Sequence, residues 1–154
     1  MERLYAQRDK MNMPFHGAKL AILAEGYIPV ILRDARADIP WPGYWDLPVG
    51  GRENGESPVT CALRETFEEL HLAIVPGQIF WGRAFGEAPA RGWFFAAHAR
   101  IEALRDVVLG EEGQRWGLMR YDGFLNHPRA IPHLQDRFRM VLKEIAQTKN
   151  PPLS

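Results

Sequence analysis

The segment GESPVTCALRETFEEL places three glutamates, Glu65, Glu68 and Glu69, within one turn of a predicted helix. Like charges at this spacing repel, and each close pair costs a helix roughly 0.2–0.5 kcal/mol. No lysine follows four residues later to relieve the repulsion. Because carboxylate oxygens are the ligands that Mg²⁺ and Mn²⁺ prefer, a divalent cation held between these side chains would turn the repulsion into stabilisation. The cluster therefore predicts a metal site.

Two other interpretations of the acidic cluster are a solvated helix face, which is the usual meaning of a run of charges, and a surface that binds another protein. The preceding segment, LPVGGRENGE, favours the metal site. Gly50, Gly51 and Gly55 let the backbone turn sharply and approach another group closely. Carbonyl oxygens exposed in such a loop are ligands for hard cations, and Glu56 adds a carboxylate just before the helix.

The helix that carries the glutamates is predicted over residues 58–70, with Ser57 as its N-cap and Pro58 as its first residue. At about 100° per residue, four apolar side chains share the face opposite the glutamates, which predicts that this face packs on the core. Cys61 falls on the acidic side, where its small size leaves room for metal ions. The four apolar residues are Val59, Leu63, Phe67 and Leu70.

The spacing of the glycine, glutamate and arginine residues matches a known signature. That signature is a Gly, five residues, a Glu, seven residues, Arg-Glu, an aliphatic residue, any residue, Glu-Glu, any residue, a Gly and an aliphatic residue. On this match the chain resembles the Nudix hydrolase (MutT-like) family. The matching positions are Gly50, Glu56, Arg64, Glu65, Glu68 and Glu69.

Three positions depart from the family pattern. Thr66 replaces an aliphatic residue, His71 replaces the glycine that usually ends the helix, and Val49 stands where many members have another glycine. A residue other than glycine at position 71 either adopts a strained left-handed conformation or ends the helix differently. None of the departures removes a charged group, so they affect geometry more than chemistry.

The resemblance implies an α/β/α sandwich and Mg²⁺-dependent hydrolysis of a diphosphate bond in a nucleoside diphosphate linked to another moiety. By the same resemblance, Glu65, Glu68 and Glu69 hold Mg²⁺ (or Mn²⁺), and the Gly50 carbonyl and Glu112 complete the ligand set. The substrate classes that remain open are nucleoside triphosphates, ADP-ribose and other nucleotide sugars, and dinucleoside polyphosphates.

The remaining site residues have supporting or alternative roles by the same resemblance. Arg64 pairs with a glutamate and fixes its rotamer, and Glu56 is a peripheral ligand or orients Arg64. Water attacks a phosphorus of the diphosphate, and a carboxylate takes its proton. Glu65 and Glu112 are both candidates for this base, with Glu111 as the alternative to its neighbour Glu112.

The other elements are expected to form an α/β layered sandwich with a mixed central sheet. Apolar runs predict strands over 18–23 and 29–33 around a Glu25-Gly26 turn, and two more within 79–87 and 92–101, joined by a turn. Segment 38–57 is expected to be a structured loop, and 111–125 a loop, a short strand and a turn. A second helix is expected over 131–147, with an apolar stripe of Leu134, Phe138, Val141, Leu142 and Ile145.

Length and composition predict one domain over residues 1–154, with loose termini at about 1–13 and 148–154. Lys plus Arg and Asp plus Glu are 19 each, so the formal net charge is zero and gives no support for a nucleic-acid polymer or a membrane surface as partner. The single cysteine, the absence of a signal peptide and the lack of a long apolar run favour a cytoplasmic protein.

The predicted partner is therefore a small nucleotide substrate, and a homodimer is compatible with the sequence. The main alternative function is a catalytically inactive Nudix-like module that binds nucleotides or regulates another process. A degenerate module of that kind would lack some of the charged set, whereas Arg64, Glu65, Glu68 and Glu69 are all present.

Overall fold

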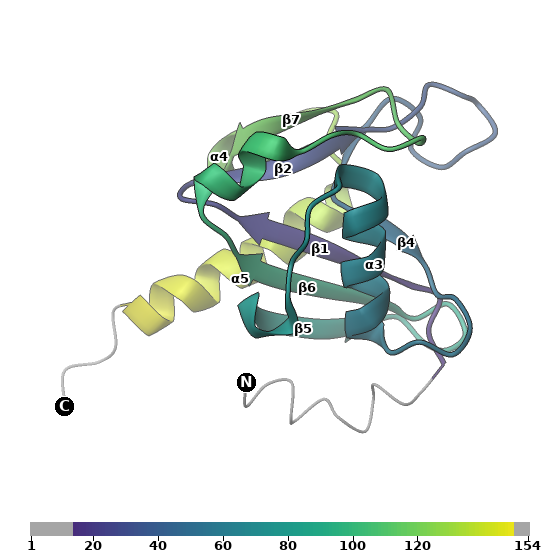
Figure 1. Ribbon diagram of the computed structural model, residues 1–154, viewed down its shortest axis with the longest axis horizontal. Helices are drawn as coiled ribbons and strands as arrows, with labels where there is room; N and C mark the ends of the chain where they lie inside the picture. The colour runs from purple at the N-terminus through teal and green to yellow at the C-terminus, as the bar shows by residue number, and fades with distance from the viewer. Residues whose placement is uncertain (1–13, 150–154) are drawn as a thin grey trace.

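The computed structural model describes residues 14–149, and segments 1–13 and 150–154 lie outside the described residues. Its largest element is a four-stranded sheet with the order β4-β1-β6-β5 (Figure 1). Strand β1 pairs antiparallel with β4 and parallel with β6, so the sheet is mixed, as the sequence predicts. The strands are β1 (Gly17–Leu23), β4 (Val49–Gly51), β5 (Ile79–Phe85) and β6 (Gly92–His98).

A second, antiparallel sheet of three strands has the order β3-β2-β7. The chain passes from the first sheet to the second at a tight turn, where Ala24 and Tyr27 form an isolated bridge. Glu25 and Gly26 within this turn have φ angles of 52° and 96°, as its tight geometry requires. The strands are β2 (Tyr27–Leu32), β3 (Trp45–Asp46) and β7 (Arg115–Arg120).

Two long helices, α3 (Pro58–Leu70) and α5 (Pro132–Lys149), cover opposite faces of the four-stranded sheet (Figure 1). Alternate side chains of a strand point to opposite faces, so β1 is buried on both sides. Leu20 and Ile22 of β1 belong to the apolar cluster on the α3 side, while Ala21 and Leu23 belong to the cluster on the α5 side. The α/β/α sandwich is confirmed, and the expected stripe of α5 supplies Leu134, Phe138 and Val141 to the second cluster.

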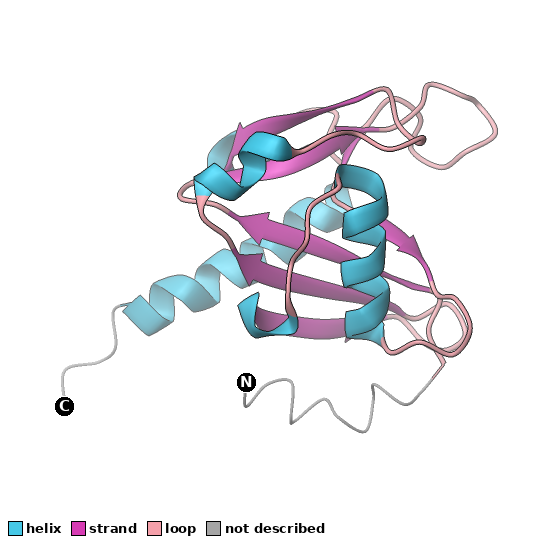
Figure 2. Cartoon of the chain, in the orientation of Figure 1, coloured by secondary structure: helices cyan, strands magenta, loops and turns pink. Residues whose placement is uncertain are grey.

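Several short elements differ from expectation (Figure 2). The segment expected to be one long loop contains β3 and β4, and the turn expected after β7 is a short helix, α4 (Tyr121–Leu125). Helix α5 extends to Lys149 and so includes the first two residues of the segment expected to be loose. No helix within residues 14–149 is both long and apolar enough to span a bilayer. Two 3₁₀ turns, η1 (Pro76–Gln78) and η2 (Ile101–Asp106), flank the strand pair β5–β6.

Helix α3 is rotated about its axis relative to the expected orientation. Phe67, expected in the core, is 52% exposed, whereas Cys61 on the expected acidic side is fully buried. The face that meets the sheet consists mainly of small side chains, because these let the helix approach the strands closely. The rotation turns Glu69 inward and leaves Glu68 outside. The buried residues of α3 are Pro58, Cys61, Ala62, Thr66 and Leu70.

The ends of α3 follow the sequence closely. The Ser57 side chain accepts a hydrogen bond from the Thr60 backbone N–H, at 3.2 Å, and caps the first turn. At the other end His71 adopts the left-handed conformation, with φ 54° and ψ 31°, and its N–H donates to the Phe67 carbonyl. Of the two alternatives for His71, a left-handed conformation or a different helix end, the structure shows the left-handed conformation. Its Nδ1 also lies 3.0 Å from the Val108 carbonyl oxygen.

We expect His71→Gly to be more stable than His71→Ala by about 1 kcal/mol, because a left-handed conformation costs about 1–2 kcal/mol for a residue with a Cβ. Both variants lose the imidazole contact with Val108, so their difference isolates the backbone term. Urea unfolding followed by circular dichroism gives the two free energies of unfolding. An alanine variant as stable as the glycine variant would contradict the expectation.

Candidate active site

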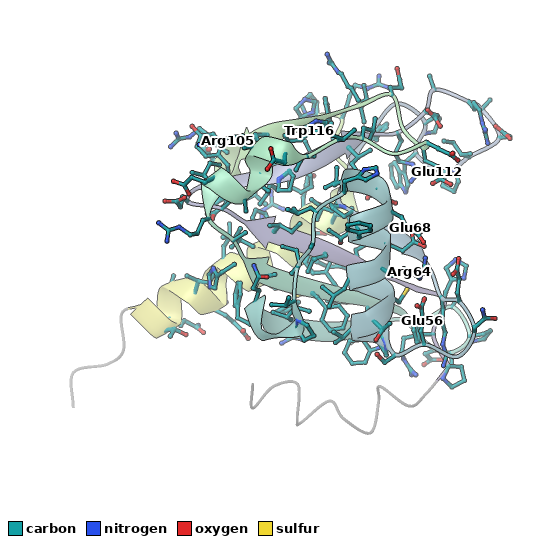
Figure 3. The ribbon with its side chains drawn as sticks, in the orientation of Figure 1. Glu56, Arg64, Glu68, Arg105, Glu112 and Trp116 are labelled. Atoms are coloured by element: carbon teal, nitrogen blue, oxygen red, sulfur yellow. The ribbon has the colours of Figure 1, made fainter. Side chains whose placement is uncertain are left out.

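Arg64 is the centre of the acidic cluster (Figure 3). Its Nη2 lies 2.7 Å from a carboxylate oxygen of Glu56, and its Nη1 lies 2.7 Å from Glu65 and 3.0 Å from Glu68. Nη2 also donates to the carbonyl of Gly51 at 2.7 Å. One guanidinium thus joins three carboxylates and relieves part of their repulsion. The resemblance predicts that Arg64 pairs with one glutamate; the pairing with Glu68 was not foreseen because Arg64 lies four residues before it and not after it.

Glu56 anchors Arg64 from the loop before the helix. Its carboxylate accepts a hydrogen bond from the Glu53 backbone N–H at 2.9 Å, and the Arg52 Nε donates to its carbonyl at 3.0 Å. The hydrogen bond from Arg64 lowers the pKa of Glu56, so this carboxylate stays ionised. Of its two predicted roles, the contacts of Glu56 correspond to the one that orients Arg64.

Gly50, in the middle of β4, makes room for Glu65. A Cβ at this position would overlap the Glu65 carboxyl group, so the close contact requires glycine. Burial raises the pKa of Glu65, while its bond to Arg64 opposes this change. Cys61 donates from its Sγ to the Gly50 carbonyl at 3.6 Å, and burial raises the pKa of its thiol to about 12. A neutral, buried thiol is a packing residue and not a nucleophile.

Glu69 is the carboxylate that the rotation of α3 turns inward. Its Oε2 accepts a hydrogen bond from the Val49 backbone N–H at 3.2 Å. The pKa of Glu69 is raised to about 8, mainly by burial; the charges of Asp46 and Glu65 also raise it, against the hydrogen bond from the Val49 N–H and the charge of Lys19. An ionised Glu69 therefore needs a cation in its surroundings.

A cavity of about 200 Å³ opens beside Glu69, between α3 and the second sheet. Glu112 lines it as well, whereas the neighbouring Glu111 does not. Gly110 brings this loop close, since its N–H donates to the Glu69 carbonyl at 2.7 Å and a Cβ there would overlap the carbonyl of Glu68. The charge of Glu112 contributes to the raised pKa of Glu65, after burial and neighbouring Glu68. Of the two neighbouring candidates, Glu112 is the one that lines the cavity.

The cavity also contains charged residues that the sequence analysis did not single out. Asp46 is buried, and its carboxylate accepts from Lys19 at 2.8 Å, from Arg33 at 2.9 Å and from the Leu47 N–H at 2.8 Å. Arg33 and Arg36 line the cavity with Glu69 and Glu112. The available signal was Asp46 itself, a charged residue within the apolar run YWDLPV.

The donor set fits a divalent cation, although no three of its side chains already surround one point. Within residues 14–149, no group of three histidine, cysteine or carboxylate side chains is disposed as a ready metal site, and three glutamates converge on Arg64 instead. The carboxylates nevertheless carry the chemistry that hard cations require. Burial raises the pKa of both Glu65 and Glu69, and a bound cation would favour their ionised forms.

The family of the chain follows from comparison with known proteins. A sequence model of the NUDIX domain matches residues 20–133, which include the acidic helix and its glycine-rich loop. The chain belongs to the Nudix family. It is thus a hydrolase acting on phosphoanhydride bonds, of the general class of nucleotide pyrophosphohydrolases. A comparison with curated protein sequences found no significant match.

Solved structures share the fold. A MutT protein from Methanosarcina mazei Go1 is 23% identical, with 85% of this chain and 95% of that chain covered and a TM-score of 0.68. An Ap4A hydrolase from C. elegans is 22% identical, with 84% and 98% covered and a TM-score of 0.60. A bifunctional NMN adenylyltransferase/ADP ribose pyrophosphatase from Francisella tularensis, complexed with AMP and a Mn ion, is 17% identical, with 93% and 46% covered and a TM-score of 0.68.

Without divalent cations, we expect Glu69 to make the stability of the protein depend on pH. Its pKa in the folded state is about 8, above the ordinary value of 4.5. Between these values the unfolded chain releases the proton first, so the stability present below pH 4.5 is lost as the pH rises to about 8. The slope from this group has a limit of about 1.4 kcal/mol per pH unit.

The measurement is urea unfolding in EDTA at several values between pH 5 and pH 8. Glu69→Gln should lose less stability than the wild-type protein over this interval, and Glu68→Gln, at an exposed position, is the matched control that should follow the wild type. A constant difference between Glu69→Gln and wild type at every pH would rule out the raised pKa.

Proposed function

We propose that the chain hydrolyses a diphosphate bond in a nucleoside diphosphate linked to another moiety, with Mg²⁺ or Mn²⁺ as cofactor. The ligands in this proposal are Glu65, Glu68 and Glu69, with the Gly50 carbonyl and Glu112 completing the set. When bound, the cation supplies charge neutralisation for phosphate oxygens and acidifies water. The observation that carries the proposal is the cavity that inward-turned Glu69 and Glu112 line together.

The residues around this cavity prepare it for an anionic substrate. Arg33 and Arg36 line the same cavity and add positive charge that would neutralise a diphosphate. Arg64 holds Glu65 and Glu68 in fixed rotamers through charged hydrogen bonds. Such preorganised positions avoid part of the reorganisation that would otherwise accompany reaction.

The proton of the attacking water goes to one of two carboxylates in this proposal. Burial makes Glu65 more basic, and Glu112 lines the cavity together with Glu69. A general base typically contributes about 10²–10⁴-fold to the rate. Glu65→Gln and Glu112→Gln therefore separate the candidates, because loss of the base lowers kcat and removes the acidic limb of the pH–rate profile.

The proposal is tested with a panel of nucleoside triphosphates, ADP-ribose, other nucleotide sugars and dinucleoside polyphosphates, with and without Mg²⁺. We expect cation-dependent release of a nucleoside monophosphate or of pyrophosphate from at least one compound, and a loss of at least 10²-fold in kcat for Glu69→Gln. Glu102→Gln, an exposed carboxylate on η2, is the charge-matched control.

No turnover of any compound by a folded protein that still binds nucleotides would favour the inactive binding module instead. Binding of another protein that Mg²⁺ abolishes, without hydrolysis, would favour the interaction surface. The cytoplasmic location expected from the sequence stays a prediction.

Gly50→Ala should lower activity by at least tenfold, because the added methyl group displaces the Glu65 carboxyl from its place beside β4. Gly51→Ala is the matched control, since a Cβ at that position meets only the His16 carbonyl, at the ordinary contact distance of 3.8 Å. Activity at saturating Mg²⁺ and the thermal midpoint are measured for both variants. Equal activities of the two variants would show that the Gly50–Glu65 contact does not matter for catalysis.

A further inference from the structure

Arg33 and Arg36 line the same cavity but are held differently. The guanidinium of Arg36 makes two bonds to the carboxylate of Asp38, at 3.1 and 3.3 Å, and both side chains are mostly exposed. The side chain of Arg33 is only 24% exposed, and it bonds through Nη1 to the buried carboxylate of Asp46 and through Nε to the Pro40 carbonyl, both at 2.9 Å. Exposed ion pairs hold side chains weakly, so Arg33 is the arginine with the fixed guanidinium.

The backbone of Arg33 is fixed as well. Its N–H donates to the Tyr44 carbonyl at 2.9 Å, and its carbonyl accepts a hydrogen bond from the Gln114 side chain at 2.8 Å. The Nη2 of Arg33, by contrast, makes no hydrogen bond to residues 14–149, although the side chain lines the cavity. An arginine that is held from its backbone to Nη1 and keeps the N–H groups of Nη2 for a ligand is suited to bind an oxyanion.

The carboxylate of Asp46, which holds Arg33, has little freedom to move. It is 2% exposed, and its Oδ1 accepts from the Leu47 N–H and from the Lys19 ammonium, both at 2.8 Å. Lys19 approaches from strand β1, where it lines a second cavity of about 230 Å³ together with Arg137. Because Lys19 and Leu47 fix Oδ1, they also fix the direction in which Oδ2 accepts from Arg33.

Charge alone does not account for an aspartate at position 46. A carboxylate beside a cavity that takes an anion repels the ligand and weakens the attraction of the arginine with which it pairs. Burying a carboxylate also has a desolvation cost. Both effects are offset if Asp46 fixes the direction in which Arg33 presents its free N–H groups, because a preorganised side chain loses less freedom when a ligand binds.

We propose that Asp46 is a positioning residue, which holds Arg33 in the orientation that binds the diphosphate of the substrate. That the ligand is a substrate diphosphate rests on the proposed function. Removal of Asp46 has two effects of opposite sign on an anionic ligand. Loss of its negative charge tightens binding, whereas loss of the fixed Arg33 weakens it, and the proposal requires the second effect to be the larger one.

Binding is measured by isothermal titration calorimetry with methylenediphosphonate and Mg²⁺, because the P–C–P bridge of this probe is not hydrolysed. We expect Asp46→Ala to bind the probe roughly tenfold more weakly than the wild-type protein. Asp46→Asn, which keeps one acceptor oxygen, should lie between the two. In a protein that already carries Arg33→Gln, the further change Asp46→Ala should cause no additional weakening, because Asp46 acts through Arg33.

The proposal is overturned if the wild-type protein does not bind the probe, or if Asp46→Ala binds it as tightly as the wild type or more tightly. Equal weakening by Asp46→Ala with Arg33 present and with Arg33→Gln also overturns it, because a merely structural role predicts that the two losses add. Asp136 and Arg139 are the matched control pair, an exposed aspartate and arginine that meet at 3.1 Å. Asp136→Ala and Arg139→Gln should bind the probe as the wild type does.

Arg33→Lys tests the same proposal without a change at Asp46, in case the Asp46 variants do not fold by circular dichroism. Lysine keeps the positive charge but not the planar fork that bonds Asp46 and the Pro40 carbonyl together. We therefore expect Arg33→Lys to bind the probe at least roughly fivefold more weakly than the wild type. Binding as tight as that of the wild type would show that charge suffices and would overturn the positioning role.

The positioning role and the proposed function fail separately. If no compound of the nucleotide panel is hydrolysed while the probe binds in the manner that depends on Asp46, the proposed function fails and the positioning role stands. If a compound is hydrolysed, Asp46→Ala should raise its KM by a larger factor than it lowers kcat, because a prearranged Arg33 acts on the bound diphosphate before reaction. A loss confined to kcat would overturn the positioning role and leave the proposed function in place.

Discussion

The close approach of helix α3 to strand β4 is the constraint on which the rest of the site depends. Small side chains such as Ala62 and Thr66 face the sheet, and Gly50 leaves space at the point of contact. This proximity places Glu65 and Glu69 in surroundings that disfavour their charged forms. Packing and electrostatics therefore oppose each other here, and Arg64 offsets part of the conflict by joining the outer carboxylates. In the proposed function, the unrelieved part gives the helix its affinity for a cation.

Sequence reasoning succeeded where the signal was local. The bounds and the N-cap of α3 follow from Ser57, Pro58 and the regular spacing, and the α5 stripe follows from helical periodicity. It failed on the rotation of α3, because hydrophobicity ranks Phe67 as a core residue whereas the nearby sheet selects small side chains. The strands β3 and β4 were not predicted, because two or three residues are too few to show the alternation of apolar and polar side chains that marks a strand.

The parts of the site also differ in whether a local sequence signal or the tertiary fold brings their residues together. The acidic set of α3 and its glycine-rich loop lie within about twenty consecutive residues, so their spacing alone relates them to a family. Asp46, Arg33 and Lys19 come together only through the pairing of strands from two sheets, and no sequence spacing encodes that meeting. Likewise Arg137 on the last helix reaches the cavity beside β1 only because α5 packs on that face of the sheet.

Asp46 has a consequence for how this protein can change over generations. Its carboxylate is shared by Arg33, which belongs to one cavity, and Lys19, which belongs to the other. Replacing either cation by a neutral residue alters the charge balance on both sides of the strand at once. The two cavities are thus tied to a single buried anion, so a substitution that changes the charge of one cavity must be accommodated in the other.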